Sequence, residues 1–484
     1  MSEIWGSEVP GKTNNCCKEI VIGGAIMATS TALLDKEELS SLRIFLLSLI
    51  LHSFLYIIIT LLLIMYQLMC IAASILFTHI LAQVPGTLTP EQHPKLTTQK
   101  CTKDGGCITV DTAIVLDASY RYTHEVGGYT PCASGIFNST ICPTVEACAK
   151  NCEVEGVDYS TYGIKTTGDA LTLNLFTTKE GILGESSPRV YLMADDSTYD
   201  MLKLLNQELS FDVDMSKVPC GINGALYLSE MPNNGGLSDL NKVGAKYGSG
   251  YCDAQCPKQA FINGMANINQ TLGACCNEMD IWEANAASTA YTPHSCNITG
   301  VYACTGDLCG NDGICDQSGC DFNSYRLGAR EFYGPGKKID TTKKFTVVTQ
   351  FLTDNGSSAG KLQTISRIYI QNGTVIANSN VNVPGMNPVS SIDDSFCTSQ
   401  VKAFGGSGTF EKLGGMAGMG SALGRGMVLI FSIWMDAGSG MLWLDGDYPL
   451  DANATKPGVS RGLVTWSNIK VGDIGSTFGG LKAF

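Results

Sequence analysis

Charged side chains are scarce in this sequence, and basic ones are the minority among them. Asp, Glu, Lys and Arg make up only 16% of the 484 residues, and 45 acidic against 32 basic residues give a net charge of −13. A chain without a basic face is poorly suited to phosphate groups, so we do not expect nucleic acid as a partner. Hydrophobic residues reach 44%, which excludes a disordered polyelectrolyte and allows a sizeable core.

Histidine is also scarce, with five residues, and no repeated C-x2-C spacing is present. These absences argue against a zinc site, so we expect no metal and no other cofactor. Cysteine is abundant by contrast: 17 of the 20 lie between Cys101 and Cys397, and several form the close pairs typical of stapled loops. Disulfides indicate an extracytoplasmic protein. Six N-x-S/T sequons indicate the same compartment, at Asn138, Asn269, Asn297, Asn355, Asn372 and Asn453.

Long helical patterns are missing as well, whereas glycine is common at 54 residues. Alternating runs predict strands at 170–177, 189–193, 209–214, 345–351 and 426–433. Only the segments 144–151 and 199–207 suggest short helices. Many strands between polar turns predict an all-β fold, a two-sheet antiparallel sandwich that forms one domain over residues 83–484.

The N-terminal region does not share this pattern of short strands and polar turns. Residues 44–82 carry no Asp, Glu, Lys or Arg, and the stretch exceeds the roughly 20 residues that span a bilayer. It is either an uncleaved membrane anchor or, from Met65 to Ala82, a signal peptide. We expect cleavage between Ala82 and Gln83, hence a secreted protein that contacts a membrane only if residues 44–82 are retained. Residues 1–43 show no motif and form an extension of unclear status.

The most informative segment is Cys275–Asn285, which holds three carboxylates within six residues. On a strand Glu278 and Asp280 share a face, because side chains alternate with a period of two. Glu283 lies at an odd offset and would face the other way. One extra residue, a β-bulge, would return it to the face of the other two acids.

With that bulge, the three acids suit glycoside hydrolysis. Two carboxyls about 5–5.5 Å apart give a covalent intermediate and retention of configuration. We assign Glu278 as nucleophile, Glu283 as acid and base, and Asp280 as the group that tunes Glu278. A solvated acidic strand or a calcium site is the alternative, and the flanking Trp282 and paired cysteines make a solvated face less suitable.

At this motif the chain resembles glycoside hydrolase family 7, the retaining cellulases. Matching stretches cover nearly all of residues 83–484: Asp117–His124, Phe211–Asp214, Cys220–Tyr227, Lys246–Asp253, Phe332–Pro335 and Gly472–Thr477. The resemblance implies a concanavalin A-like jelly roll with long disulfide-stapled loops. It implies the same roles for the three acids, and it places His294 on the leaving-group side. Gln83 falls where the mature chains of the family begin.

The family pattern also implies a set of disulfides. The pairs are Cys101–Cys107, Cys132–Cys152, Cys142–Cys148, Cys252–Cys276, Cys256–Cys275, Cys296–Cys315, Cys304–Cys309 and Cys320–Cys397. One family bridge is lost at both ends, at Gly86 and Glu153. Another loses one end, which leaves Cys220 unpaired.

The resemblance further implies a groove for a sugar polymer, in which aromatic rings stack on glucose and polar groups hold its hydroxyls. Trp434 and Trp443 match family platforms near the cleavage point, and Tyr120 and Tyr122 stand where tryptophans are usual at distal subsites. Polar or aromatic cleft positions are matched by Asn223, Tyr227, Asp253, Gln255, Arg189 and, on the product side, Arg461. A lysine that often precedes Phe261 is absent.

Loop lengths distinguish modes of action within the family. The loops 267–275, 309–315 and 461–466 are short compared with those that roof the tunnel of exo-acting members. We therefore expect a monomeric endoglucanase that cleaves internal β-1,4 bonds of cellulose or soluble β-glucan. A cellobiohydrolase is the alternative within the family. A lectin-like glucan-binding protein is the alternative outside catalysis, and wall remodelling by transglycosylation is a third.

Overall fold

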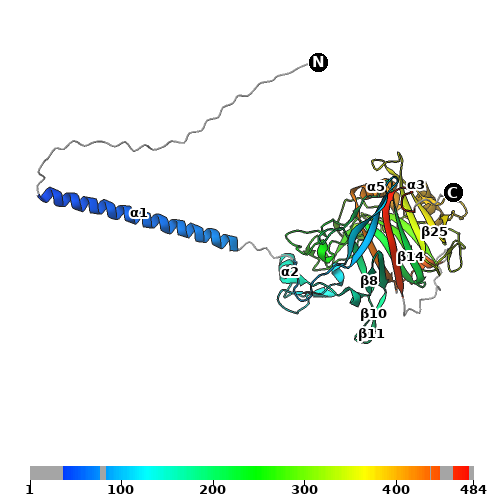
Figure 1. The fold of residues 1–484 in the computed structure, drawn as a ribbon, viewed down its shortest axis with the longest axis horizontal. Coiled ribbons are helices and arrows are strands. Elements are labelled where there is room, and N and C mark those ends of the chain that lie inside the picture. The colour runs from blue at the N-terminus through cyan, green and yellow to red at the C-terminus, as the bar shows by residue number, and fades with distance from the viewer. Residues whose placement is uncertain (1–35, 77–82, 437, 447–461, 479–484) are drawn as a thin grey trace, which may run out of the picture. The chain divides into compact units, whose positions relative to one another are not determined.

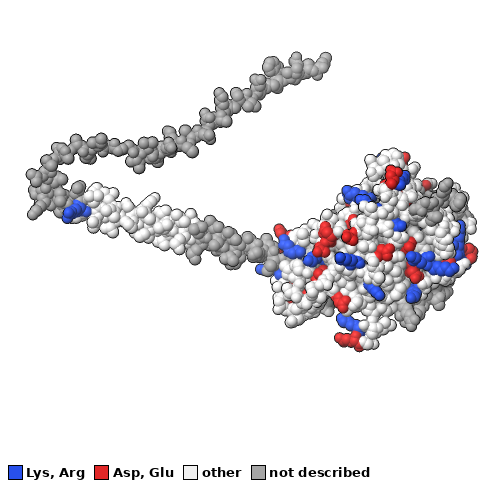
Figure 2. Space-filling view, in the orientation of Figure 1, with Lys and Arg blue, Asp and Glu red and all other residues white. Residues whose placement is uncertain are grey.

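A computed structural model describes residues 36–76, 83–436, 438–446 and 462–478. The chain divides into two compact units, Met1–His79 and Ile80–Phe484. The described part of the first unit is one helix, α1 (Lys36–Leu76). Within it Arg43–Gln67 has a mean hydropathy of 2.5 and exposed side chains, and the part of this segment that follows the basic residue at its start is white in Figure 2, without charged side chains. Such a helix is long and apolar enough to cross a membrane, and a signal sequence has the same properties.

The second unit is built on one hydrogen-bonded path of strands whose two halves meet at the β2–β3 pair. Strands β14 and β25 of this path are labelled in Figure 1. One half, the cleft sheet, runs in the order β20 (Thr289–His294), β19 (Glu278–Ala284), β15 (Ile222–Ser229), β28 (Met427–Met435), β12 (Arg189–Met193) and β3 (Gly106–Leu116), with β13 (Met201–Leu202) beside β28. The other half, the outer sheet, runs in the order β2 (Lys95–Thr102), β29 (Leu463–Asp473), β14 (Gln207–Lys217), β24 (Phe345–Thr353), β25 (Leu362–Gln371) and β26 (Thr374–Ala377), with β8 (Ile164–Thr167), β9 (Ala170–Asn174) and β27 (Ser391–Ile392) at its margins. Neighbouring strands along this path are antiparallel except β2 and β29.

The two halves pack face to face over one large apolar core. Leu209 and Phe211 of β14 and Leu429 and Phe431 of β28 are fully buried members of that core. Their spacing of two is the strand period, so the intervening residues of β28 face the opposite side of the cleft sheet. The predicted two-sheet sandwich is confirmed.

Short strands and helices fill the loops. The strands are β1 (Val84–Pro85), β4 (Thr123–Glu125), β5 (Ala133–Ser134), β6 (Ile136–Phe137), β7 (Cys152–Val154), β10 (Phe176–Lys179), β11 (Ile182–Glu185), β16 (Phe261–Ile262), β17 (Met265–Ala266), β18 (Leu272–Cys275), β21 (Tyr302–Thr305), β22 (Tyr333–Gly334) and β23 (Ile339–Asp340). The helices are α2 (Val145–Asn151), α3 (Asp394–Phe404), α4 (Thr409–Lys412), α5 (Gly415–Arg425) and α6 (Leu442–Asp445).

Of the two helices expected from sequence, one forms and one does not. The segment 144–151 forms α2, whose N-cap Thr144 accepts a hydrogen bond from the Ala147 N–H. The segment 199–207 is extended up to Leu204 and then turns at 205–206: Leu202 pairs with Met427 as part of β13, and Leu202 and Leu204 are buried at a spacing of two. That is a strand pattern, and the helix prediction there was wrong.

All eight predicted disulfides are present, and Cys220 is free and exposed. The family disulfide that this chain lacks, between positions 86 and 153, is replaced by a different contact. A Cβ on Gly86 would lie 2.0 Å from Oε1 of Glu155, so the Glu155 carboxylate occupies the space beside this glycine.

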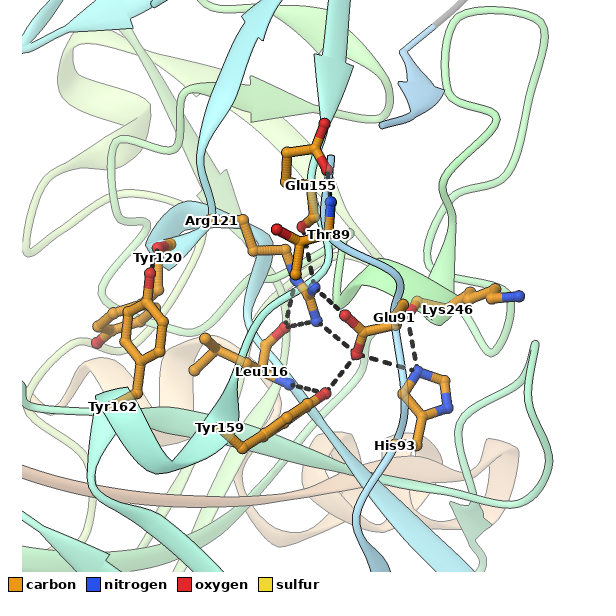
Figure 3. Close-up of polar contacts among 10 residues, drawn as sticks. All are labelled: Thr89, Glu91, His93, Leu116, Tyr120, Arg121, Glu155, Tyr159, Tyr162 and Lys246. Atoms are coloured by element: carbon orange, nitrogen blue, oxygen red, sulfur yellow. Dashed lines mark hydrogen bonds and ion pairs between the residues drawn. The ribbon is translucent and has the colours of Figure 1, made fainter. Parts of the chain in front are cut away.

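A polar cluster fastens the chain that leads into the sandwich, residues 83–94 (Figure 3). The buried guanidinium of Arg121 pairs with the carboxylate of Glu91, which also accepts a hydrogen bond from the Tyr159 hydroxyl. The Thr89 N–H donates to Glu155 Oε2 at 2.7 Å. We call this group, Thr89, Glu91, Arg121 and Tyr159, the strap cluster.

Candidate active site

The predicted bulge is present in β19. Leu226 of β15 pairs with Trp282, and the next residue Tyr227 pairs with Asp280, so Ile281 is the extra residue. The same irregularity occurs against β20 between Asp280 and Glu283. Ile281 and Trp282 both enter the core. Glu283 is thereby returned to the cleft side, and all three acids line one cavity of about 710 Å³.

Glu278 begins β19 and is almost fully buried. Its Oε2 accepts a hydrogen bond from the Ala254 N–H at 3.0 Å. Burial, followed by the nearby charges of Asp280 and Asp253, raises its pKa well above the usual range, while the Ala254 N–H and His294 oppose this rise.

Asp280 is held by His294 of the neighbouring strand β20. The His294 Nε2 lies 2.9 Å from Asp280 Oδ2, and its Nδ1 lies 2.8 Å from the backbone oxygen of Asp316. Burial alone would lower the pKa of His294, but the hydrogen bond and charge of Asp280 outweigh it and raise the pKa to about 10. Both ring nitrogens then carry protons and donate to the oxygens they face.

Glu283 is more open than the other two acids. Asn223 of β15 donates from Nδ2 to Glu283 Oε1 at 2.9 Å and accepts the Ala284 N–H at 3.0 Å. Burial and then the charge of Asp280 raise the pKa of Glu283 well above its usual range. A carboxyl with a raised pKa that faces a cleft is suited to deliver a proton near neutral pH.

Most of the predicted binding residues line the same cavity. They are Trp434, Trp443, Tyr120, Arg189, Tyr227, Asp253 and Gln255. The rings of Trp434 and Trp443 stack with centroids 6.3 Å apart, and both are partly exposed. The Tyr120 hydroxyl donates to the Ser187 oxygen at 2.6 Å, which holds its ring in the cavity lining.

Three predicted residues lie elsewhere. Asn223 is fully buried and contacts Glu283 rather than lining the cavity. Tyr122 stacks on His124 and lines a second cavity of about 640 Å³, which shares Tyr251 with the first. Arg461 lies outside the described residues.

The sequence analysis did not predict the residues that hold the guanidinium of Arg189, which are Asp117 and Tyr251. Asp117 Oδ2 accepts hydrogen bonds from Nε and Nη2 of Arg189, at 2.8 and 2.6 Å, and the guanidinium carbon lies 3.4 Å from the ring centroid of Tyr251. The Tyr251 hydroxyl donates to Asp253 at 2.7 Å. Both Asp117 and Tyr251 lie within stretches that carried the family resemblance, so position within a matching stretch was the available signal.

A second pair was also missed. Asp321 and Arg326 line the cavity and form an ion pair, and Arg326 Nη1 lies 3.5 Å from the backbone oxygen of Trp443. The pair is five residues apart in a turn, and no sequence pattern marked it.

Metal binding fits the cluster poorly. Ligand atoms of Glu278, Asp280 and His294 lie within 4.8 Å of one another. A histidine ligand needs a free ring nitrogen, however, and both nitrogens of His294 face oxygen acceptors. The arrangement suits proton transfer and nucleophilic attack instead.

A cavity lined by clustered carboxyls and by aromatic rings is the arrangement that glycoside hydrolysis needs. Comparison with known proteins makes this specific: the chain belongs to glycosyl hydrolase family 7, whose model matches residues 85–464. The chain is 51% identical over 407 residues to the endo-beta-1,4-glucanase celB of Aspergillus oryzae, across 82% of this chain and 96% of that protein.

Solved structures agree. The endocellulase EGI of Humicola insolens superimposes with a TM-score of 0.74 and 44% identity, over 81% of this chain and 100% of that chain. A family 7 cellobiohydrolase from Daphnia pulex superimposes with a TM-score of 0.76 and 40% identity over the same shares. The shared fold therefore spans proteins named for endo and for exo action.

Proposed function

We propose that this protein is an endo-β-1,4-glucanase that hydrolyses internal bonds of cellulose or related β-glucans with retention of configuration. The observation that carries the proposal is the bulge in β19, which brings Glu278, Asp280 and Glu283 to one wall of a cleft flanked by stacked tryptophans. The endoglucanase name of the Aspergillus oryzae relative supports it.

The reaction proceeds in two displacements. Glu278 attacks the anomeric carbon while Glu283 donates its proton to the departing glycosidic oxygen, which leaves a glycosyl ester on Glu278. Glu283, now ionised, removes a proton from water, and the water oxygen displaces Glu278. The Ala254 N–H and the positive charge of His294 favour the ionised form of Glu278.

Two loop observations support endo action. Asn267 closes the first loop by accepting the Leu272 N–H at 3.1 Å and by donating to the Leu272 oxygen at 2.8 Å. The second loop folds on itself through the Cys304–Cys309 bridge and tight turns. Neither the first loop, 267–275, nor the second, 309–315, contributes a residue to the lining of the catalytic cavity, so neither loop roofs it. The third loop, 461–466, begins outside the described residues. A cleft that the two described loops leave open admits the middle of a chain.

A product assay tests this mode. On soluble carboxymethyl cellulose we expect viscosity to fall steeply while few reducing ends appear. Release of mainly cellobiose with little loss of viscosity would favour a cellobiohydrolase instead. Binding without hydrolysis would favour a lectin, and product formation on added acceptor sugars would reveal transglycosylation.

For the N-terminal region we propose a leader that is removed after Ala82, which releases residues 83–484 as a secreted monomeric domain. The apolar helix and the start of the family match at residue 85 support this boundary. N-terminal sequencing of the secreted protein should begin at Gln83. Recovery of the activity only in membranes would show that residues 44–82 are a retained anchor.

A further inference from the structure

Arg367 lies in the core of the sandwich, behind the strand that carries the acids. It belongs to β25 of the outer sheet and is only 2% exposed. Its Nη2 donates to the backbone oxygen of Ile281, and its Nε donates to Thr349 Oγ1 at 3.1 Å. The side chain therefore reaches from one sheet to the other and contacts the extra residue of the bulge.

The surroundings of this cation are aromatic rather than acidic. The guanidinium carbon lies 4.2 Å from the ring centroid of Tyr291 and 5.7 Å from that of Trp282. Its Nη1 has no hydrogen-bond partner, and no carboxylate among the described residues forms an ion pair with it. Cation–π contacts offset part of the desolvation, but a buried charge without a counterion remains costly. An apolar side chain of similar size would fill the space without that cost.

The position of the bulge suggests a role for the Arg367 guanidinium. Ile281 has no partner in the register with β15 or β20, because a bulge leaves its extra residue outside the ladder. Trp282 follows it, and Tyr291 is the residue of β20 that lies between the partners of Asp280 and Glu283. Arg367 thus contacts the unpaired carbonyl and both rings that border the bulge.

We propose that Arg367 is a positioning residue for the hydrolytic reaction, which stabilises the bulged register and so holds Glu283 on the cleft face. This inference rests on the proposed function, because it takes Glu283 as the acid and base. Glu278 precedes the bulge and keeps its own pairing with Ser229 and its hydrogen bond from Ala254. Loss of Arg367 should therefore displace Glu283 more than Glu278.

Substrates with different leaving groups distinguish a displaced Glu283 from a displaced Glu278, because only Glu283 protonates the leaving group. Arg367→Met should fold, because apolar replacement of a buried ion is often neutral or stabilising. We expect kcat/KM on cello-oligosaccharides to fall about 10- to 100-fold, since a displacement near 1 Å has effects of this size. On 2,4-dinitrophenyl cellobioside, whose leaving group needs no proton, kcat/KM should stay within about threefold of wild type, because Glu283 assists this step little.

Azide gives a second readout. It attacks the anomeric carbon of the glycosyl-enzyme without a base, forms the glycosyl azide and frees the Glu278 carboxylate. Added azide should raise kcat of Arg367→Met on the aryl glycoside and leave the wild type unchanged. Arg367→Lys, which keeps the charge and a donor, should lie between the two and carries the comparison if Arg367→Met does not fold.

The matched control is Arg121→Met, which removes another buried arginine from the strap cluster (Figure 3). Arg121→Met should lower stability, but it should change kcat/KM on cello-oligosaccharides and on the aryl cellobioside by the same factor. Equal losses on both substrates for the Arg367 variants, no loss on either, or no azide response would overturn the role of Arg367. Failure of the wild type to cleave β-glucan would instead overturn the proposed function.

Discussion

Two clusters in this protein are built from the same kinds of side chain but lie in different surroundings. The cleft cluster contains Glu278, Asp280 and His294, and the buried triad contains Glu153, His124 and Glu155. In each, a histidine Nε2 lies 2.9 Å from a carboxylate oxygen, and all six residues are buried.

What differs is what the carboxylates face. The cleft cluster lines the catalytic cavity, whereas none of the buried triad lines either cavity. In the triad, Glu155 accepts the Thr89 N–H and Glu153 accepts the Gly127 N–H, so both acids join segments of the chain. His124 also lies 3.6 Å from Glu153 through its other nitrogen. The same residue types therefore stand in two settings, and only the cleft cluster, which the proposed function takes as catalytic, lines a cavity that can admit substrate.

The largest effect should come from Glu278→Gln in the cleft cluster. We expect kcat to fall at least about 10⁴-fold, because the nucleophile is lost. Thermal stability near neutral pH should not fall, since burial raises the pKa of Glu278 and its charge therefore opposes folding above the unfolded pKa. Kinetics and melting curves check this, with the exposed Glu180→Gln as control. Full activity in Glu278→Gln would refute its assignment.

Asp280→Asn should have the next largest effect. It removes the partner of His294 and so lowers the pKa of that histidine, whose positive charge favours the ionised form of Glu278. It also removes the Asp280 charge that opposes ionisation of Glu278, and we expect the loss of His294 as a fixed cation to dominate. We expect kcat to fall about 10²- to 10³-fold, as measured on cello-oligosaccharides. Unchanged kcat would show that Asp280 is as purely structural as Glu155.

Glu155→Gln should show the reverse behaviour. It leaves His124 with a weaker partner in the core, so we expect a loss of about 2–4 kcal/mol in unfolding free energy with little change in kcat. Denaturant unfolding measures the first and a standard assay the second. Glu125→Gln, which removes an exposed carboxyl one residue from His124, is the control and should change neither.

The pH dependence of that loss should be distinctive. Burial alone would lower the pKa of His124, but Glu155 and the other acceptors raise it above 6.5. A raised histidine pKa stabilises the fold at low pH, and this stabilisation disappears as pH rises through the folded pKa. The stability gap between wild type and Glu155→Gln should therefore be full below pH 6.5 and narrow as the pH rises above 6.5. A gap that widens would contradict the buried triad as described.

Asn223→Ala should give the smallest effect. Its amide favours the ionised form of Glu283, so its removal should raise the pKa of Glu283 further. The basic limb of the kcat/KM profile should then move to higher pH. A shift to lower pH would mean that Asn223 does not act on Glu283.

The alternation of side chains along a strand was enough to predict the bulge, because Glu278, Asp280 and Glu283 share a face only if one residue is extra. Family resemblance supplied the disulfides. Long-range contacts were out of reach: Arg367 meets Ile281 from 86 residues away, and no local pattern encodes that pairing. The Gly-rich helix α5 was missed because packing of Met416, Met419 and Leu423 outweighs its weak propensity.

The central claim is that Glu278 is the nucleophile brought into the cleft by a bulged strand. Incubation with an activated 2-deoxy-2-fluoro cellobioside should trap the glycosyl-enzyme, and mass spectrometry of the digested protein should place the sugar on Glu278. A label on Asp280 or Glu283, or no covalent label in an enzyme that hydrolyses β-glucan, would contradict the account.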